Sequence, residues 1–373
     1  MYMFNKETQC INGEGRSEYE ASVSPPIFQT STFEGGGEYS YTRLSNPTRR
    51  ALERELAVLE GGTHAFAFSS GLSAVSVVFL LLKSGDRVLI SDDLYGGTYR
   101  MTRLLRGLGI EFEFIDTSDP DTVEAELKKG AAMVFVESPT NPMMKVAPLA
   151  DIAGLCREHG VLFAVDNTFL TPYFQNPLSL GADIAVHSAT KYLSGHHDTV
   201  AGAVVVNDEA LAERISYISM TFGNALSPFD SWLVLRGIRT LALRMEKHQK
   251  NAFAVCKALK ELTSVERVIY PGLPEHEGFS LMKSQASGYG GVVSFLLRDT
   301  GRVDRLLKGG EIIRFAESLG GFCSLITYPL TQTHASVPKE MRERIGINER
   351  LLRLSVGLEN DKDITQDIYN LLA

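Results

Sequence analysis

Short apolar runs alternate with segments of helical periodicity between residues 64 and about 190. The runs have the length of buried strands and cover residues 65–68, 87–90, 112–115, 132–136, 162–165 and 184–186. Helical patterns separate them, for example over residues 71–83 and 98–108. Strands separated by helices of this length predict βαβ crossovers and a mostly parallel sheet.

The pattern differs on both sides of this region. Residues 1–45 hold Pro25-Pro26 and a Gly35–Gly37 run without sustained periodicity, which predicts an extended arm. Asn46 and Pro47 then start a helix, and Gly61-Gly62 ends it. Beyond residue 244 the alternation fades, with a strand-like stretch at 288–297 and a helix-like stretch at 302–307. We therefore predict an arm (1–45), a large α/β domain (46–244) and a smaller α+β domain (245–373).

Composition narrows the class of protein. A chain of 373 residues exceeds the usual size of one hydrophobic core, which agrees with two domains. The net charge of −8 and the lack of a basic run argue against binding to nucleic acid. The most apolar stretch, residues 74–82, is too short to cross a membrane, and the N-terminus lacks a signal-peptide pattern. Four scattered cysteines indicate free thiols in the cytoplasm and no metal site.

Lys191 is the first candidate for chemistry. It belongs to the stretch His187–Tyr192, which follows the apolar run 184–186 and so lies just past the carboxyl end of a predicted strand. Ligands of open α/β sheets bind at these ends. A lysine amine becomes a useful nucleophile only when burial or nearby charge lowers its pKa, so the neighbouring residues decide whether Lys191 is catalytic or a surface lysine.

Four further groups lie at predicted strand ends. Ser69-Ser70-Gly71 precedes a helix whose free N–H groups suit a phosphate, although small residues fill many such turns. Ser188 and Thr190 add hydroxyls to the same place. Tyr95 offers a ring for stacking, or packs as an ordinary half-buried tyrosine. Asp166 ends an apolar strand, either as a turn cap or as an anion for a protonated ring nitrogen.

Together these groups describe one cofactor. An amine that forms an imine, a carboxylate for a pyridinium, a phosphate cradle and a stacking ring are the groups that pyridoxal 5'-phosphate requires. The combination is far more specific than any of its parts.

The chain also resembles the Cys/Met-metabolism (transsulfuration) pyridoxal-phosphate enzymes. This family includes cystathionine γ-synthase and the cystathionine β- and γ-lyases. The resemblance runs in order through ten blocks, at residues 41–43, 46–48, 69–71, 95–99, 138–142, 165–168, 187–192, 317–321, 333–336 and 353–357. It implies the aspartate-aminotransferase-like fold (fold type I), with a central sheet and a smaller C-terminal domain.

The resemblance implies roles at the cofactor that agree with the residue chemistry. Lys191 would hold the cofactor covalently, Asp166 would keep its ring nitrogen protonated, and Tyr95 would stack on the ring and handle leaving-group protons. The phosphate would be bound by Gly71, Leu72, Ser188 and Thr190.

Further implied roles concern the partner subunit and the substrate. In this family the arm supplies Tyr41 and Arg43 to the phosphate of a neighbouring subunit, and the assembly is a homotetramer built from such dimers. Arg353, with Asn141 and Ser324 near it, would hold the substrate α-carboxylate.

Three positions depart from the family pattern. Cys323 stands where many cystathionine-using relatives carry a glutamate before the serine, which puts recognition of the distal amino group in question. Gly97 replaces the cysteine that marks methionine γ-lyases. His197 stands where a serine is usual.

The leading hypothesis is therefore a carbon–sulfur lyase that acts on cystathionine or a related sulfur amino acid and gives a thiol, a 2-oxo acid and ammonia. The alternative within the family is γ-replacement, of the cystathionine γ-synthase or O-acyl-homoserine sulfhydrylase type. An aminotransferase-like enzyme of the same fold and a non-catalytic cofactor-binding scaffold are the alternatives from other classes.

Overall fold

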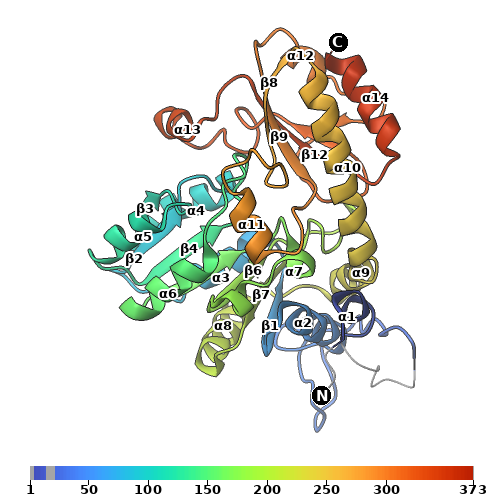
Figure 1. The fold of residues 1–373 in the computed structure, drawn as a ribbon. Coiled ribbons are helices and arrows are strands. Elements are labelled where there is room, and N and C mark those ends of the chain that lie inside the picture. Colours follow the sequence, from blue (N-terminus) through green and yellow to red (C-terminus); the bar gives the residue numbers. More distant parts are fainter. Residues whose placement is uncertain (1–3, 14–21, 373) are drawn as a thin grey trace.

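The computed structural model describes residues 4–13 and 22–372, so residues 1–3 and 14–21 of the predicted arm, and residue 373, lie outside it. Two sheets organise the chain, a seven-stranded sheet from the first two thirds and a five-stranded sheet from the last third (Figure 1). This confirms a mostly parallel central sheet with a smaller C-terminal α+β part.

The large sheet has the order β1-β7-β6-β5-β4-β2-β3. Its strands are β1 (His64–Phe68), β2 (Arg87–Ser91), β3 (Glu111–Ile115), β4 (Met133–Glu137), β5 (Leu162–Asp166), β6 (Ile184–His187) and β7 (Gly202–Val206). Neighbours from β3 to β6 are parallel, whereas β7 is antiparallel to both β6 and β1. Strand β7 was not predicted; it is a buried run that separates β1 from the parallel strands.

Helices cover both faces of this sheet, which explains why its strands are continuous apolar runs. Successive residues of β4 alternate between faces: Phe135 packs in one buried cluster with α3 (Gly71–Phe79) and α8 (Glu209–Phe222). Val134 packs in another with α5 (Pro120–Leu127) and α6 (Leu149–His159). The strand ends are thereby fixed from two sides.

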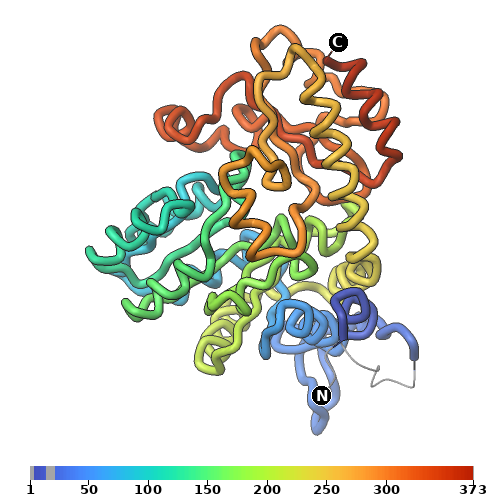
Figure 2. The backbone as a smooth tube through the Cα atoms, viewed as in Figure 1, coloured from blue at the N-terminus to red at the C-terminus, as the bar shows by residue number. Residues whose placement is uncertain are grey.

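The C-terminal sheet has the order β10-β11-β12-β9-β8. Its strands are β8 (Val265–Ile269), β9 (Val292–Leu297), β10 (Arg314–Phe315), β11 (Leu325–Thr327) and β12 (Leu351–Ser355). Helices α10 (Leu241–Glu261) and α14 (Asp361–Leu372) pack with it in one buried cluster. Figure 2 shows α10 running from the large domain up to this sheet, so one helix is shared by the two parts.

The remaining helices connect these layers. They are α1 (Lys6–Asn12), α2 (Pro47–Glu60), α4 (Gly96–Arg106), α7 (Thr171–Phe174), the 3-10 turn η1 (Pro177–Leu180), α9 (Pro228–Ile238), α11 (Phe279–Gln285), α12 (Val303–Leu306) and α13 (Lys339–Ile345). Helix α2 begins at the Asn46 cap and ends at Gly61, as predicted. Helix α1 was not predicted, and it packs on α2 and α10 through buried Cys10. Within the described ranges, no helix has the length and apolarity that a membrane span requires.

Candidate active site

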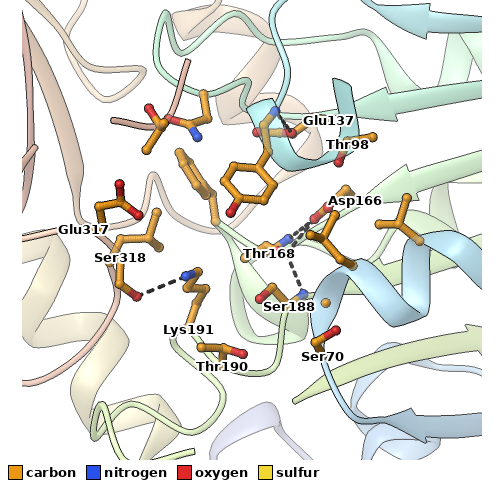
Figure 3. Close-up of a pocket in the computed structure, with 18 of the residues that line it drawn as sticks. Ser70, Thr98, Glu137, Asp166, Thr168, Ser188, Thr190, Lys191, Glu317 and Ser318 are labelled. Carbon is orange, nitrogen blue, oxygen red and sulfur yellow. Dashed lines mark hydrogen bonds between the residues drawn. The ribbon is translucent and has the colours of Figure 1, made fainter. Parts of the chain in front are cut away.

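The carboxyl ends of the large-sheet strands surround a cavity of about 320 Å³. Segments after β1, β4, β5 and β6 line one side, and Glu317, Ser318 and Arg353 of the C-terminal part line the other. Figure 3 shows Lys191 facing Ser318, with Asp166, Thr168 and Ser188 as a separate group. The parallel sheet therefore collects residues that are far apart in the sequence.

Lys191 is enclosed in this cavity. Its Nζ donates a hydrogen bond of 3.0 Å to Oγ of Ser318. Burial, and then the positive charge of Arg353, lower the pKa of Lys191 to about 8. The amine is therefore close to the protonation equilibrium that a general base needs near neutral pH.

Asp166 is held by a chain of hydrogen bonds. Backbone N of Thr168 donates to Oδ1 of Asp166 at 3.0 Å, and Oγ1 of Thr168 donates to the same oxygen at 2.5 Å. Oγ1 of Thr168 in turn accepts from the backbone N of Ser188 at 2.8 Å. Burial raises the pKa of Asp166, and both bonds from Thr168 oppose that rise. Since both bonds go to Oδ1, Oδ2 is available to a cation in the cavity.

The start of α3 forms a cradle beside β6. Ser70 caps this helix by accepting from the backbone N of Ser73 at 3.0 Å. A Cβ on Gly71 would lie 2.7 Å from Cβ and Oγ of Ser188, so glycine allows the helix start to approach this serine. Leu72 and Thr190 also line the cavity. The hydroxyl of Thr190, however, already donates to the carbonyl oxygen of Ala201.

Tyr95 is the N-cap of α4, and its position is fixed from two directions. Its backbone N donates to Oε2 of Glu137 at 3.1 Å. The carbonyl oxygen of Leu94 accepts from Nε2 of His334 at 2.9 Å. A Cβ on Gly97 would lie 2.3 Å from Cε1 of Tyr95, so the glycine leaves room for this ring orientation.

Arg353 projects from β12 into the same cavity and is 1% exposed. Its Nη1 donates to Oδ1 of Asn141 at 2.9 Å. Its Nη2 donates to the carbonyl oxygen of Ser318 and to Oγ1 of Thr327. Nε is buried and has no partner among the described residues, so this donor is available to an anionic ligand.

Ser324 is the predicted site residue that the structure places elsewhere. Its hydroxyl donates to Oε2 of Glu359 and accepts from the backbone N of Gly357, and it does not line the cavity. Cys323, beside it, lines a neighbouring cavity together with His197. The structure therefore does not bring Ser324 together with Lys191 and Arg353, because its hydroxyl bonds inside the C-terminal part.

Tyr41 and Arg43 also lie away from this cavity in the isolated chain. Tyr41 is 42% exposed, and the Arg43 guanidinium lies over its ring at 5.5 Å. Arg43 donates to the carbonyl oxygen of Met220 at 2.8 Å. The single chain therefore does not bring Tyr41 and Arg43 to the cavity of Lys191.

Four residues that line the cavity or orient its side chains were not predicted: Glu137, Thr168, Ser318 and Thr327. Glu137 carried the same signal as Asp166, a carboxylate that ends an apolar strand. Thr168 lay in a family block without an assigned role. Ser318 also lay in a family block without an assigned role, whereas Thr327 carried no local signal. Both reach the site only through the packing of the C-terminal part.

The residues present fit pyridoxal phosphate. The available oxygen of Asp166 suits a ring nitrogen, the Gly71–Ser188 approach suits a phosphate, and Lys191 lines the same cavity.

Comparisons with known proteins agree with this geometry. The family model "Cys/Met metabolism PLP-dependent enzyme" matches residues 7–373. The chain is 45% identical to cystathionine beta-lyase of Lactococcus lactis subsp. cremoris over 377 residues, with 99% of each chain covered. It is 44% identical to cystathionine gamma-synthase/O-acetylhomoserine (thiol)-lyase of Bacillus subtilis, with 97% of this chain and 94% of the relative covered. The solved structure of cystathionine gamma-lyase from Lactobacillus plantarum, complexed with L-serine, superposes with a TM-score of 0.96 at 40% identity and covers 99% of this chain and 98% of that one.

Proposed function

Because the chain belongs to the Cys/Met-metabolism family of PLP-dependent enzymes, we propose that it cleaves a carbon–sulfur bond in cystathionine or a related sulfur amino acid. The products are a thiol, a 2-oxo acid and ammonia. The observation that carries the proposal is the amine of Lys191, enclosed opposite Asp166 and beside Arg353 in one cavity.

Lys191 is the proposed base. When bound, the cofactor supplies an aldehyde carbon that Lys191 can attack and an electron-withdrawing ring that acidifies the substrate Cα. Lys191 takes the Cα proton, which its lowered pKa favours near neutral pH. Ser318 orients the amine through the bond to Nζ.

Asp166 is the proposed contact for the cofactor ring, and Tyr95 is the proposed proton donor or acceptor for the leaving group. Asp166 would keep the cofactor's ring nitrogen protonated, and Thr168 keeps the carboxylate oriented. Tyr95, whose backbone is fixed by Glu137 and His334, delivers or removes the proton of the leaving sulfur.

Arg353 is the proposed contact for the substrate α-carboxylate. Its guanidinium is already oriented by Asn141 and Thr327, and its buried Nε lacks a partner within the described residues. A bound carboxylate gives this donor an acceptor, and the fixed orientation lowers the entropic cost of binding.

Glu317 is the proposed contact for a distal amino group. It lines both the cavity of Lys191 and the neighbouring cavity of Cys323. A carboxylate at that junction suits the ammonium of a substrate such as cystathionine, in which a second amino acid lies beyond the sulfur. In this proposal Glu317 recognises the distal amino group in place of the glutamate that Cys323 replaces.

The alternative is γ-replacement, in which a thiol adds after the leaving group has departed. The relative from Bacillus subtilis that is named as a synthase and thiol-lyase supports this alternative. The residues around Lys191 serve both reactions, since the two share the removal of the Cα proton.

A product assay tests the proposal. Purified protein with the cofactor should release 2-oxo acid and ammonia from cystathionine, and an added thiol acceptor should not divert the products. Thiol-dependent formation of a thioether from an activated homoserine, without 2-oxo acid, would favour replacement. No reaction with either substrate class would overturn both.

We also propose that the protein assembles as a cytoplasmic homotetramer. Tyr41 and Arg43 are exposed, as residues that serve a neighbouring subunit must be before assembly. Tyr217 and Phe222 of α8 are each 65% exposed, which is unusual for aromatic side chains on a free surface. The four cysteines are free, in keeping with a reducing compartment. Analytical ultracentrifugation of the holoprotein tests the assembly.

A further inference from the structure

Two carboxyl groups lie side by side at the edge of the large sheet. Glu137 ends β4 and Asp166 ends β5, and the two residues are register partners in this parallel pair. Both line the cavity of Lys191 (Figure 3). Neighbouring strands are about 4.8 Å apart, so two negative charges at these positions would repel one another strongly away from water.

The surroundings stabilise a charge on Asp166 better than on Glu137. Two donors from Thr168 reach Asp166, whereas Glu137 accepts from the backbone N of Tyr95. Glu137 is 7% exposed and forms no ion pair with any described residue. Arg353, the cation that faces it from β12, donates instead to Asn141, Ser318 and Thr327.

We propose that Glu137 is a neutral carboxylic acid that positions Tyr95, and that the negative charge of the carboxyl pair resides on Asp166. A protonated carboxyl still accepts from the N–H of Tyr95 through the oxygen that carries no proton. Glu137 therefore holds the segment between β2 and α4 without adding charge. Asp166 would then be the one carboxylate of the pair that is charged when a cofactor is bound. The inference rests on the proposed function only in that this cavity holds the cofactor.

On balance, the titratable groups around Glu137 favour its neutral form. Asp166 on β5 and Asp93 after β2 both face it, while Arg353 is the opposing cation, and Lys191 and Glu317 line the same cavity. Burial, then the charge of Asp166, raise the pKa of Glu137 well above its ordinary value. Arg353 and the bond from Tyr95 only partly oppose this rise.

Infrared difference spectroscopy of the cofactor-free and loaded protein tests the protonation state directly. The wild-type-minus-E137Q spectrum at neutral pH should contain a positive protonated-carboxyl C=O band, because the variant lacks this group. Glu111→Gln, at an exposed position on β3, is the matched control and should remove carboxylate bands. Loss of carboxylate bands in E137Q as well would overturn the proposal. E137L provides the same difference spectrum if E137Q does not fold.

Thermal unfolding of the cofactor-free protein gives a second readout. A carboxyl whose folded pKa is raised stabilises the fold below its ordinary pKa, and this stability is lost as pH rises toward the folded value. The Tm of E137Q minus that of wild type should therefore increase from pH 5 to pH 7, while the E111Q difference should not. A constant or decreasing E137Q difference would refute the neutral acid.

Steady-state kinetics test the positioning role. E137A removes the acceptor of the Tyr95 N–H and should lower kcat by about tenfold or more, whereas the amide oxygen of E137Q should restore most of it. Equal loss in both variants would contradict the role. The spectra and unfolding curves need no substrate, so they decide the proposal even if the proposed reaction proves wrong.

Discussion

Replacing Thr168 by valine removes one hydroxyl and leaves the shape of the side chain almost unchanged. That hydroxyl donates to Oδ1 of Asp166 at 2.5 Å and accepts from the backbone N of Ser188 at 2.8 Å. The substitution therefore affects the orientation of the carboxylate and the first residue after β6 together.

The magnitude follows from the two bonds. A hydrogen bond to a charged group contributes about 1.5–3 kcal/mol, whereas the N–H of Ser188 is only half-buried and lines the cavity, so that water can replace its lost acceptor. We expect T168V to lower the free energy of unfolding of the cofactor-free protein by about 1.5–3 kcal/mol. The weaker support of the Asp166 carboxylate should also weaken cofactor binding by about tenfold or more, since 1.4 kcal/mol corresponds to a factor of ten.

Thr168→Ser is the control, because it keeps the hydroxyl and loses a methyl group that contributes only about 0.8 kcal/mol. Urea unfolding of the cofactor-free proteins gives the stability difference, and titration with pyridoxal phosphate gives the affinity. The reasoning is refuted if T168V and T168S unfold within about 1 kcal/mol of one another and bind the cofactor equally well.

Four other predictions concern the amine of Lys191 and the two arginines Arg353 and Arg43. Lys191→Ala should abolish both turnover and the absorbance of the bound cofactor, and an active colourless variant would reject the assignment. The lowered pKa of Lys191, about 8 against 10.5, means that the unfolded chain binds more protons between these values. The cofactor-free protein should therefore gain stability as pH rises from 8 to 10, which Lys191→Met should remove in unfolding curves. Arg353→Lys should lower kcat/KM by about thirtyfold or more, because lysine lacks the planar guanidinium that Asn141 and Thr327 orient. If Arg353 contacts the substrate carboxylate, this difference between variant and wild type should disappear for a substrate that lacks the carboxylate. Arg43→Ala should speed cofactor loss on dialysis, and unchanged retention would argue against a clamp from the neighbouring subunit.

The sequence alone determined the sheet, the cofactor and the residues that follow its strands. Lys191, Asp166 and Gly71 could be identified because parallel strands place their carboxyl ends at one edge, so a short local pattern is enough to group them. The same rule would have identified Glu137. Strand β7 was missed because no helix separates it from β6, so it falls outside the alternation of strands and helices that identified the other strands.

The tertiary structure alone decided what surrounds these residues. Ser318 bonds Lys191 across 127 positions of sequence, and His334 bonds the carbonyl of Leu94 across 240. Ser324 resembled a site residue in sequence, but its hydroxyl is used by Glu359. Such contacts depend on how the C-terminal part packs against the large sheet. Side-chain direction there is set by burial and hydrogen-bond satisfaction over the whole fold, which local sequence does not encode.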